Sequence, residues 1–150
     1  MKFSINALLV TMLFFSFQIL SAQCPGCEIN LPQLPADTIF LSNAPDGKAG
    51  VYYNEDFSFR MPKTTDPVNA LDPSIPAGLT LDEVKILAVV NLPPGLNWEG
   101  DQTTFNPANE TDGCVKLCVT PLQPGFYEMI IVLEAKISVV SQTASYSNSI

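Results

Sequence analysis

The chain has 150 residues, of which 15 are acidic and 7 are basic, and its formal net charge is −8. An acidic chain repels phosphate backbones, so we expect no nucleic-acid partner. Histidine, the residue that most often serves as a general base or zinc ligand, is missing from the sequence. The composition therefore argues against an enzyme, and we predict no catalytic residue, no metal site and no cofactor.

The N-terminus has the layout of a secretory signal peptide. A basic start at Lys2 precedes an apolar run over residues 7–20, and small side chains lead to a cleavage point after Ala22. The run is too short to span a bilayer, and no later segment is apolar enough to do so. We expect a signal peptide at residues 1–22, a secreted or cell-surface location, and a mature chain with no membrane span. A lipoprotein anchored at Cys24 is disfavoured, because glutamine precedes it where a small residue is expected.

The rest of the sequence is typical of short strands joined by turns. The chain carries 13 prolines and 8 glycines among many β-branched and aromatic residues. Residues 23–35 are punctuated by proline and are expected to form an extended N-terminal arm. The predicted strands lie, in chain order, at residues 38–41, 51–61, 79–91, 96–99, 103–105, 114–119 and 126–140.

Four segments decide the expected architecture. Alternation of β-branched residues in 79–91 favours a strand over a helix. Residues 62–78 are rich in proline and are expected to form a loop, and no helix of useful length is predicted. The apolar run 126–140 is the best candidate for a central strand, and residues 141–150 are either an edge strand or a linker. This regular spacing predicts an all-β antiparallel sandwich.

Two turn motifs carry a family resemblance. LPPGLNW at residues 92–98 places Gly95 where a positive φ is needed, and TPLQPGFY at residues 120–127 marks a second turn. Both resemble segments of bacterial immunoglobulin-like, cadherin-like domains of the putative-Ig type, found in secreted surface proteins of Bacteroidetes. The resemblance covers residues 36–140 and implies an immunoglobulin-like sandwich of about seven strands. The chain departs from the family pattern at Val119, where glycine is usual.

The resemblance implies a non-catalytic module with a structural or adhesion role at the cell surface or in the extracellular space. Its partners would be other surface proteins or glycans. The alternative is a carbohydrate-binding module that stacks exposed aromatic rings on sugars, with Trp98, Tyr52 and Tyr53 as speculative ligand-binding residues. A core position for Trp98 is the simpler interpretation. An enzyme with paired carboxylates ranks third, because the sequence singles out no pair.

Four cysteines in an exported chain predict two disulfides. Cys114 and Cys118 lie on one face of a predicted strand about 13 Å apart, which is too far for a mutual bond. We expect them to bond to Cys24 and Cys27 of the arm, as 24–114 with 27–118 or as 24–118 with 27–114. A local Cys24–Cys27 bridge stays open. A redox C-x-x-C pair and a zinc site are both disfavoured in this context.

Two surface features remain as hypotheses. Thr38, in the sequence Asp-Thr-Ile, resembles the O-glycosylation site that Bacteroidetes use, so it is a speculative glycosylation residue; a plain strand start is the alternative. Acidic side chains near the predicted turns are interpreted as surface charge, because the dense Asp-x-Asp motifs of a calcium site are missing. These are Glu55, Asp56, Asp82, Glu83, Asp101 and Asp112.

Overall fold

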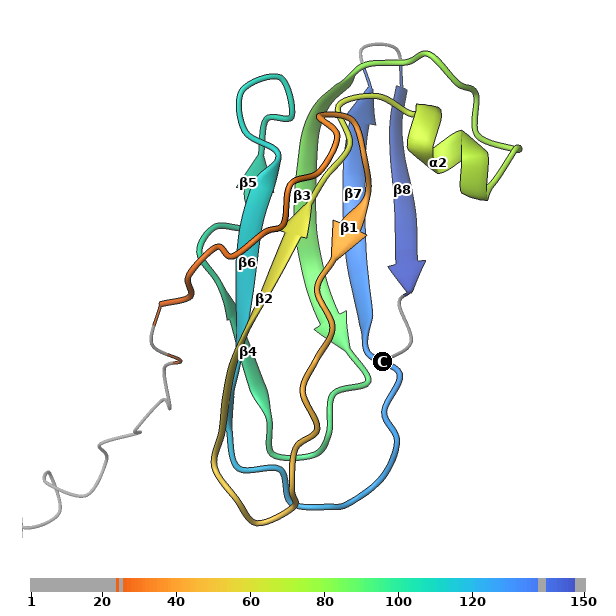
Figure 1. Cartoon of the computed structure of the whole chain (residues 1–150). Coiled ribbons are helices and arrows are strands. Elements are labelled where there is room, and N and C mark those ends of the chain that lie inside the picture. Colours follow the sequence, from red (N-terminus) through yellow and green to blue (C-terminus); the bar gives the residue numbers. More distant parts are fainter. Residues whose placement is uncertain (1–23, 25, 138–139, 148–150) are drawn as a thin grey trace, which may run out of the picture.

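The computed structural model describes residues 24, 26–137 and 140–147, so the expected signal peptide at residues 1–22 lies outside the described part of the chain. Figure 1 shows the strands as two layers packed face to face, with one short helix at the upper end. The predicted all-β antiparallel sandwich is confirmed. Its elements are β1 (Phe40–Leu41), β2 (Tyr53–Arg60), α2 (Asp66–Leu71), β3 (Leu81–Val90), β4 (Asn97–Gly100), β5 (Thr104–Phe105), β6 (Asp112–Val119), β7 (Ile130–Ile137) and β8 (Val140–Ser147).

Each layer is a four-stranded antiparallel sheet. The first sheet has the order β1-β2-β6-β4 and the second has the order β5-β3-β7-β8. The ambiguous segment 79–91 forms β3, as predicted, and the apolar run 126–140 supplies β7, which lies inside its sheet. β8 lies at the edge of the second sheet, so residues 140–147 take the edge-strand alternative rather than that of a linker.

The core lies between the two sheets. β2 contributes Phe57 and Phe59, β6 contributes Val115 and Leu117, and all four side chains are buried. Phe105 of β5 meets Phe59 edge-on, with ring centroids 5.5 Å apart, an arrangement that aromatic pairs favour. These contacts fix the relative position of the sheets.

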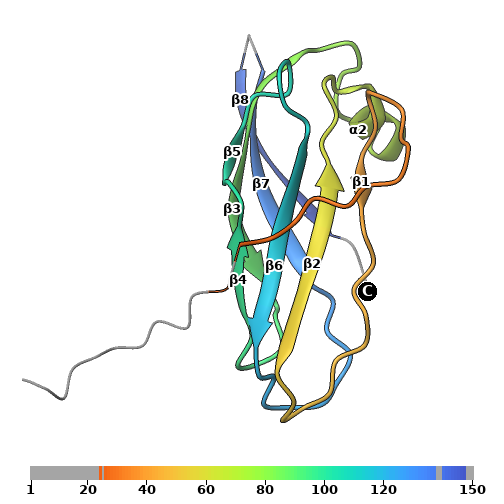
Figure 2. The same ribbon diagram turned by 60° about the vertical axis from the view of Figure 1, so that its left-hand side comes forward.

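The arm covers the outer face of the first sheet, as Figure 2 shows where the orange segment crosses β6 and β2. The Asn30 N–H donates to the Ser58 hydroxyl (2.7 Å). The ion pair of Lys116 with Asp56 (2.9 Å) lies on the same strands, and Ser58 and Lys116 are both buried. Ser58 lies on the outer face of β2, opposite the buried Phe57 and Phe59, and it is buried because the arm excludes water from that face.

A short helix, α2, replaces the loop predicted for residues 62–78. Its proline lies at the first turn, where a missing N–H leaves no hydrogen bond unmade. The Thr65 hydroxyl donates to the Pro76 carbonyl (2.6 Å) and the Asp66 carboxylate accepts from the Gly78 N–H (2.7 Å). These bonds join the start of the segment to its end, so the proline-rich sequence folds back on itself around the short helix α2.

The predicted strands 96–99 and 103–105 are confirmed, whereas the start of the predicted strand 126–140 is wrong. The predicted strands 96–99 and 103–105 become β4 and β5, but these belong to different sheets, because the chain crosses the sandwich between them. β7 begins at Ile130 rather than at Phe126. Residues 120–129 have to carry the chain from β6 in the first sheet to β7 in the second, and this crossing keeps them in a loop.

Candidate functional site at the loop end

Three loops meet at one end of the sandwich, the lower end in Figure 1. They are residues 42–52, 91–96 and 120–129, and we call this surface the loop end. The Gly50 N–H donates to the Pro121 carbonyl (2.8 Å), and the Leu122 N–H donates to the Pro94 carbonyl (2.7 Å). Backbone hydrogen bonds thus join all three loops into one surface.

The two turn motifs that carry the family resemblance, at residues 92–98 and 120–127, contact each other at the loop end. Gly95 has φ 95°, as its place in the LPPG turn predicted. A Cβ atom at Gly95 would lie 2.6 Å from the Thr120 carbonyl oxygen, closer than real contacts allow. Both the positive φ and the close approach require glycine at this position, and the loops could not otherwise meet.

Val119, the last residue of β6, has φ 87°. A β-branched residue in the left-handed region is a conformational outlier, with a cost of about 1–2 kcal/mol. Glycine adopts a positive φ without this cost, which gives a physical reason why the family that the sequence resembles usually has glycine at this position. Val119 pairs with Tyr53 in the β2–β6 register, so the strained residue lies directly beneath the loop end.

Large apolar side chains gather on the loop end. Val51 is 54% exposed, Tyr52 61%, Leu122 70% and Phe126 106%. These are four of the eight exposed large hydrophobic side chains in the described part of the chain. Val90, at the end of β3, is a fifth at 41%. Large apolar side chains that are exposed at one end of a domain commonly mark an interaction surface.

Tyr53 anchors this surface from below. Its hydroxyl donates to the Pro45 carbonyl (2.9 Å), and its ring packs against the core. Burial, together with the nearby charges of Glu55 and Asp46, raises the pKa of Tyr53 to about 12. The phenol therefore stays neutral, keeps its proton to donate and fixes the 42–52 loop.

The structure does not bring the three proposed ligand-binding aromatics together as one open site. Tyr52 projects from the loop end, whereas Tyr53 and Trp98 are half-buried and pack against the core. Sequence reasoning missed Phe126 and Leu122, the two most exposed members. An apolar residue next to an apolar run gives no sign of the sheet crossing, so the sequence pattern places Phe126 in the following strand. The proline-glycine pair before it was the one available signal of a loop.

The four cysteines form two disulfides that attach the arm to β6, and we call this pair of bonds the disulfide clamp. Cys24 bonds to Cys118 and Cys27 bonds to Cys114, with Cα–Cα distances of 5.6 and 6.0 Å. This is one of the two cross-pairings that the sequence left open. The Asp101 carboxylate lies near Cys27 and Cys114 and accepts a hydrogen bond from the Cys114 N–H (3.1 Å). Because both sulfurs are bonded, this group has no thiolate with which to ligate a metal ion.

Thr38 follows Asp37, which joins the segment after the arm to the residues that precede α2. The Asp37 carboxylate accepts from the Lys63 N–H (2.7 Å) and from the Thr64 hydroxyl (2.6 Å). Burial raises the pKa of Asp37, but these hydrogen bonds outweigh it and the net pKa is lowered. Asp37 thus has a structural role, Thr38 is half-buried, and glycosylation at Thr38 stays a prediction.

Comparisons with protein-family models, with curated proteins and with solved structures find no match for this chain. Among the described residues, no helix has the length and apolar character needed to cross a membrane.

Proposed function

We propose that the chain is a secreted, non-catalytic immunoglobulin-like module with a structural or adhesion role at the cell surface or in the extracellular space. The two disulfides support the compartment, because such bonds persist in oxidising environments. The signal-peptide pattern of residues 1–22 and the family-like turn motifs support it independently.

The exposed apolar surface of the loop end is the observation that carries this proposal. Its side chains come from separate loops, and hydrogen bonds between those loops hold them on a common platform. A surface ordered in advance loses little conformational entropy when it binds. Loops displayed on a rigid scaffold are also where binding residues concentrate. We therefore propose that the loop end contacts another surface protein.

The charged groups with shifted pKa values support the non-catalytic part of the proposal. Arg60 and Asp112 pair with each other across β2 and β6, and Asp37 holds the backbone before α2. Each of these groups is engaged in joining two segments of the fold. The pKa values of Asp37 and Asp112 are both lowered, away from the neutral range in which a general acid or base works best.

A binding experiment on cells tests the proposal. Labelled mature protein is titrated onto washed cells of the organism that encodes the chain, with excess unlabelled protein as competitor. We expect saturable binding that weakens at least tenfold in the double variant Tyr52→Ser/Phe126→Ser. The matched control is Leu87→Ser, because Leu87 is 45% exposed on β3, outside the loop end, and we expect it to bind like wild type.

Two results would overturn the adhesion role. One is the lack of saturable binding by the wild-type protein, and the other is an equal loss in the loop-end variant and the Leu87→Ser control. A glycan array run with the same proteins separates the carbohydrate-binding alternative, which Tyr52 favours because its ring is open to solvent. Glycan binding that Tyr52→Ser removes would replace the protein partner with a sugar.

A further inference from the structure

A cavity of about 500 Å³ lies between the two sheets. Alternate residues of β7 form one wall and β2 lies opposite. The lining is mostly apolar, with Arg60, Thr65 and Asp72 as its polar members. The wall residues are Ile131, Leu133, Ala135, Ile137, Phe59 and Met61. Interiors of folded proteins are close-packed, with few voids larger than a water molecule. A space of this size is therefore one that the chain's own described side chains do not fill.

The cavity exists because the two sheets end unequally on one side. The first sheet ends with β1, which has 2 residues, whereas the second ends with β8, which has 8. Figure 1 shows both on the same side of the sandwich. As a result Val84 of β3 is buried, whereas its register partner Ala135 on β7 is half-exposed.

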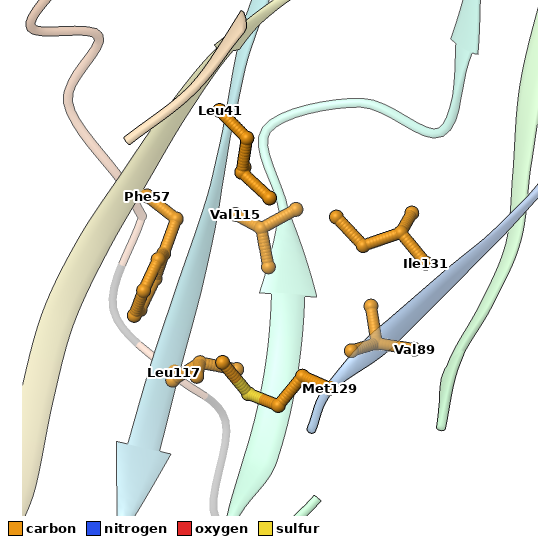
Figure 3. Close-up of a pocket in the computed structure, with 7 residues that line it drawn as sticks. All are labelled: Leu41, Phe57, Val89, Val115, Leu117, Met129 and Ile131. Carbon is orange, nitrogen blue, oxygen red and sulfur yellow. The ribbon is translucent and has the colours of Figure 1, made fainter. Parts of the chain in front are cut away.

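Apolar side chains border the cavity at both ends. At the upper end, Val68 and Leu71 of α2 line it. At the lower end, Leu41 and Ile131 line both this cavity and a gap of about 20 Å³ that Met129 also borders. Figure 3 shows these side chains converging there. The apolar lining therefore continues from one end of the cavity to the other.

The polar side chains at the cavity are already engaged. The Arg60 guanidinium donates to Asp112 and to the Leu34 carbonyl, and Thr65 donates to Pro76. The Asp72 carboxylate accepts from the Ser74 N–H. A sugar, nucleotide or amino acid bound here would bury polar groups without partners, which is costly. An apolar ligand has no such cost, and the volume lies within the range of small-molecule sites.

We propose that this cavity binds one acyl chain. The site is separate from the loop end and does not depend on the function proposed for that surface. The acyl chain would lie between β7 and β2, with α2 at the upper end of the cavity. It can come from a free fatty acid or from a membrane lipid, which share this chemistry.

Titration with the uncharged apolar fluorophore N-phenyl-1-naphthylamine tests the proposal. We expect saturable binding with one site per chain, and displacement by an acyl-chain competitor. Displacement by oleic acid but not by phosphatidylcholine vesicles identifies a free acid, and displacement by both identifies a membrane lipid as a source. Displacement by neither overturns the proposal.

Ala135→Phe places a ring in the cavity, and Leu87→Phe adds similar bulk on an exposed part of β3. We expect the first variant to bind the fluorophore at least tenfold more weakly and the second to bind it as wild type does. Ile137→Phe fills the same cavity and serves if Ala135→Phe does not fold, as judged by circular dichroism. Unchanged binding in a folded cavity variant, or loss of binding in Tyr52→Ser/Phe126→Ser, would place the fluorophore elsewhere and contradict the proposal.

Discussion

Arg60 and Asp112 are register partners at the end of the β2–β6 pairing and form a two-point ion pair. Nε lies 2.6 Å from Oδ1 and Nη2 lies 2.6 Å from Oδ2. The same guanidinium donates from Nη1 to the Leu34 carbonyl (2.9 Å). One side chain thus joins the two longest strands of the first sheet to the end of the arm. Planar two-point pairing of this kind is specific to arginine.

This pair predicts a loss of stability at low pH. The hydrogen bonds from Arg60 hold the pKa of Asp112 below its ordinary value. A lowered folded-state pKa contributes stability above the unfolded-state pKa, near ~4, that is lost as the pH falls through the folded-state value. We expect the urea midpoint to fall between pH 6 and pH 2.5, and to fall less in Asp112→Asn. The control is Glu110→Gln, in an exposed loop, whose urea midpoint should fall as much between pH 6 and pH 2.5 as that of the wild-type protein. If the midpoint of Asp112→Asn also falls as much as that of the wild-type protein, the ion pair is not the cause of the loss.

The strained backbone at Val119 predicts a stabilising substitution. Val119→Gly removes the penalty of φ 87° and adds the entropy cost of glycine, roughly 0.5–1 kcal/mol. We expect a net gain in unfolding free energy of up to about 1 kcal/mol, measured by urea denaturation. Val51→Gly is the control, because Val51 is not among the positive-φ residues, and it should not be stabilised. A loss at Val119 as large as that at Val51 would show that no strain is stored there.

At Gly113 we predict the opposite effect, a loss of stability when a side chain is added. A Cβ atom there would lie 2.6 Å from Cζ of Phe59 and 2.8 Å from the ring of Phe105, so Gly113→Ala forces apart the edge-on aromatic pair. Overpacking of this kind costs about 1–3 kcal/mol. Gly26→Ala is the matched control, because a Cβ atom there meets nothing within 4 Å. Equal melting temperatures for the two variants would contradict the packing described for this core.

The disulfide clamp predicts a large contribution to stability. The two bonds close sequence separations of 94 and 87 residues, and each bond contributes roughly 4 kcal/mol in the chain-entropy model. With the Cys27–Cys114 bond intact, Cys24 and Cys118 are already held close together, so Cys24→Ser/Cys118→Ser opens only a short loop. We therefore expect it to lower the unfolding free energy by about 2–3 kcal/mol rather than by the value for a long loop. Differential scanning calorimetry with and without reductant measures the effect. A variant as stable as wild type would show that the arm adds nothing to the fold.

The strand pattern was predictable because alternation and turn residues are local. The burial of Ser58 and Lys116 was not, since both are polar and become buried only when the distant arm crosses their strands. Phe126 likewise has no local mark that separates an exposed loop residue from the start of β7. The immunoglobulin-like classification stays a prediction, since the architecture confirms a two-sheet sandwich and no comparison identifies the family.

The candidate site was predictable only in part. Tyr52 was identified from its aromatic character, and the Gly95 turn from the LPPG motif. The cavity depends on β1 being 2 residues long, a consequence of how the sheets end rather than of any residue pattern. The cysteine pairing was limited to two choices because both partners on β6 lie on one face; the direction in which the arm crosses the sheet decides between them.

That pairing underlies both the covered outer face of the first sheet and the extracellular proposal, so mapping it in the wild-type protein is the most direct test. The unreduced protein is denatured, alkylated and digested after Lys116, which separates Cys114 from Cys118. Fragmentation between Cys24 and Cys27 in the linked peptides then assigns each bond. We predict Cys24 linked to Cys118 and Cys27 linked to Cys114. A closed Cys24–Cys27 loop, or Cys24 linked to Cys114, would contradict the account.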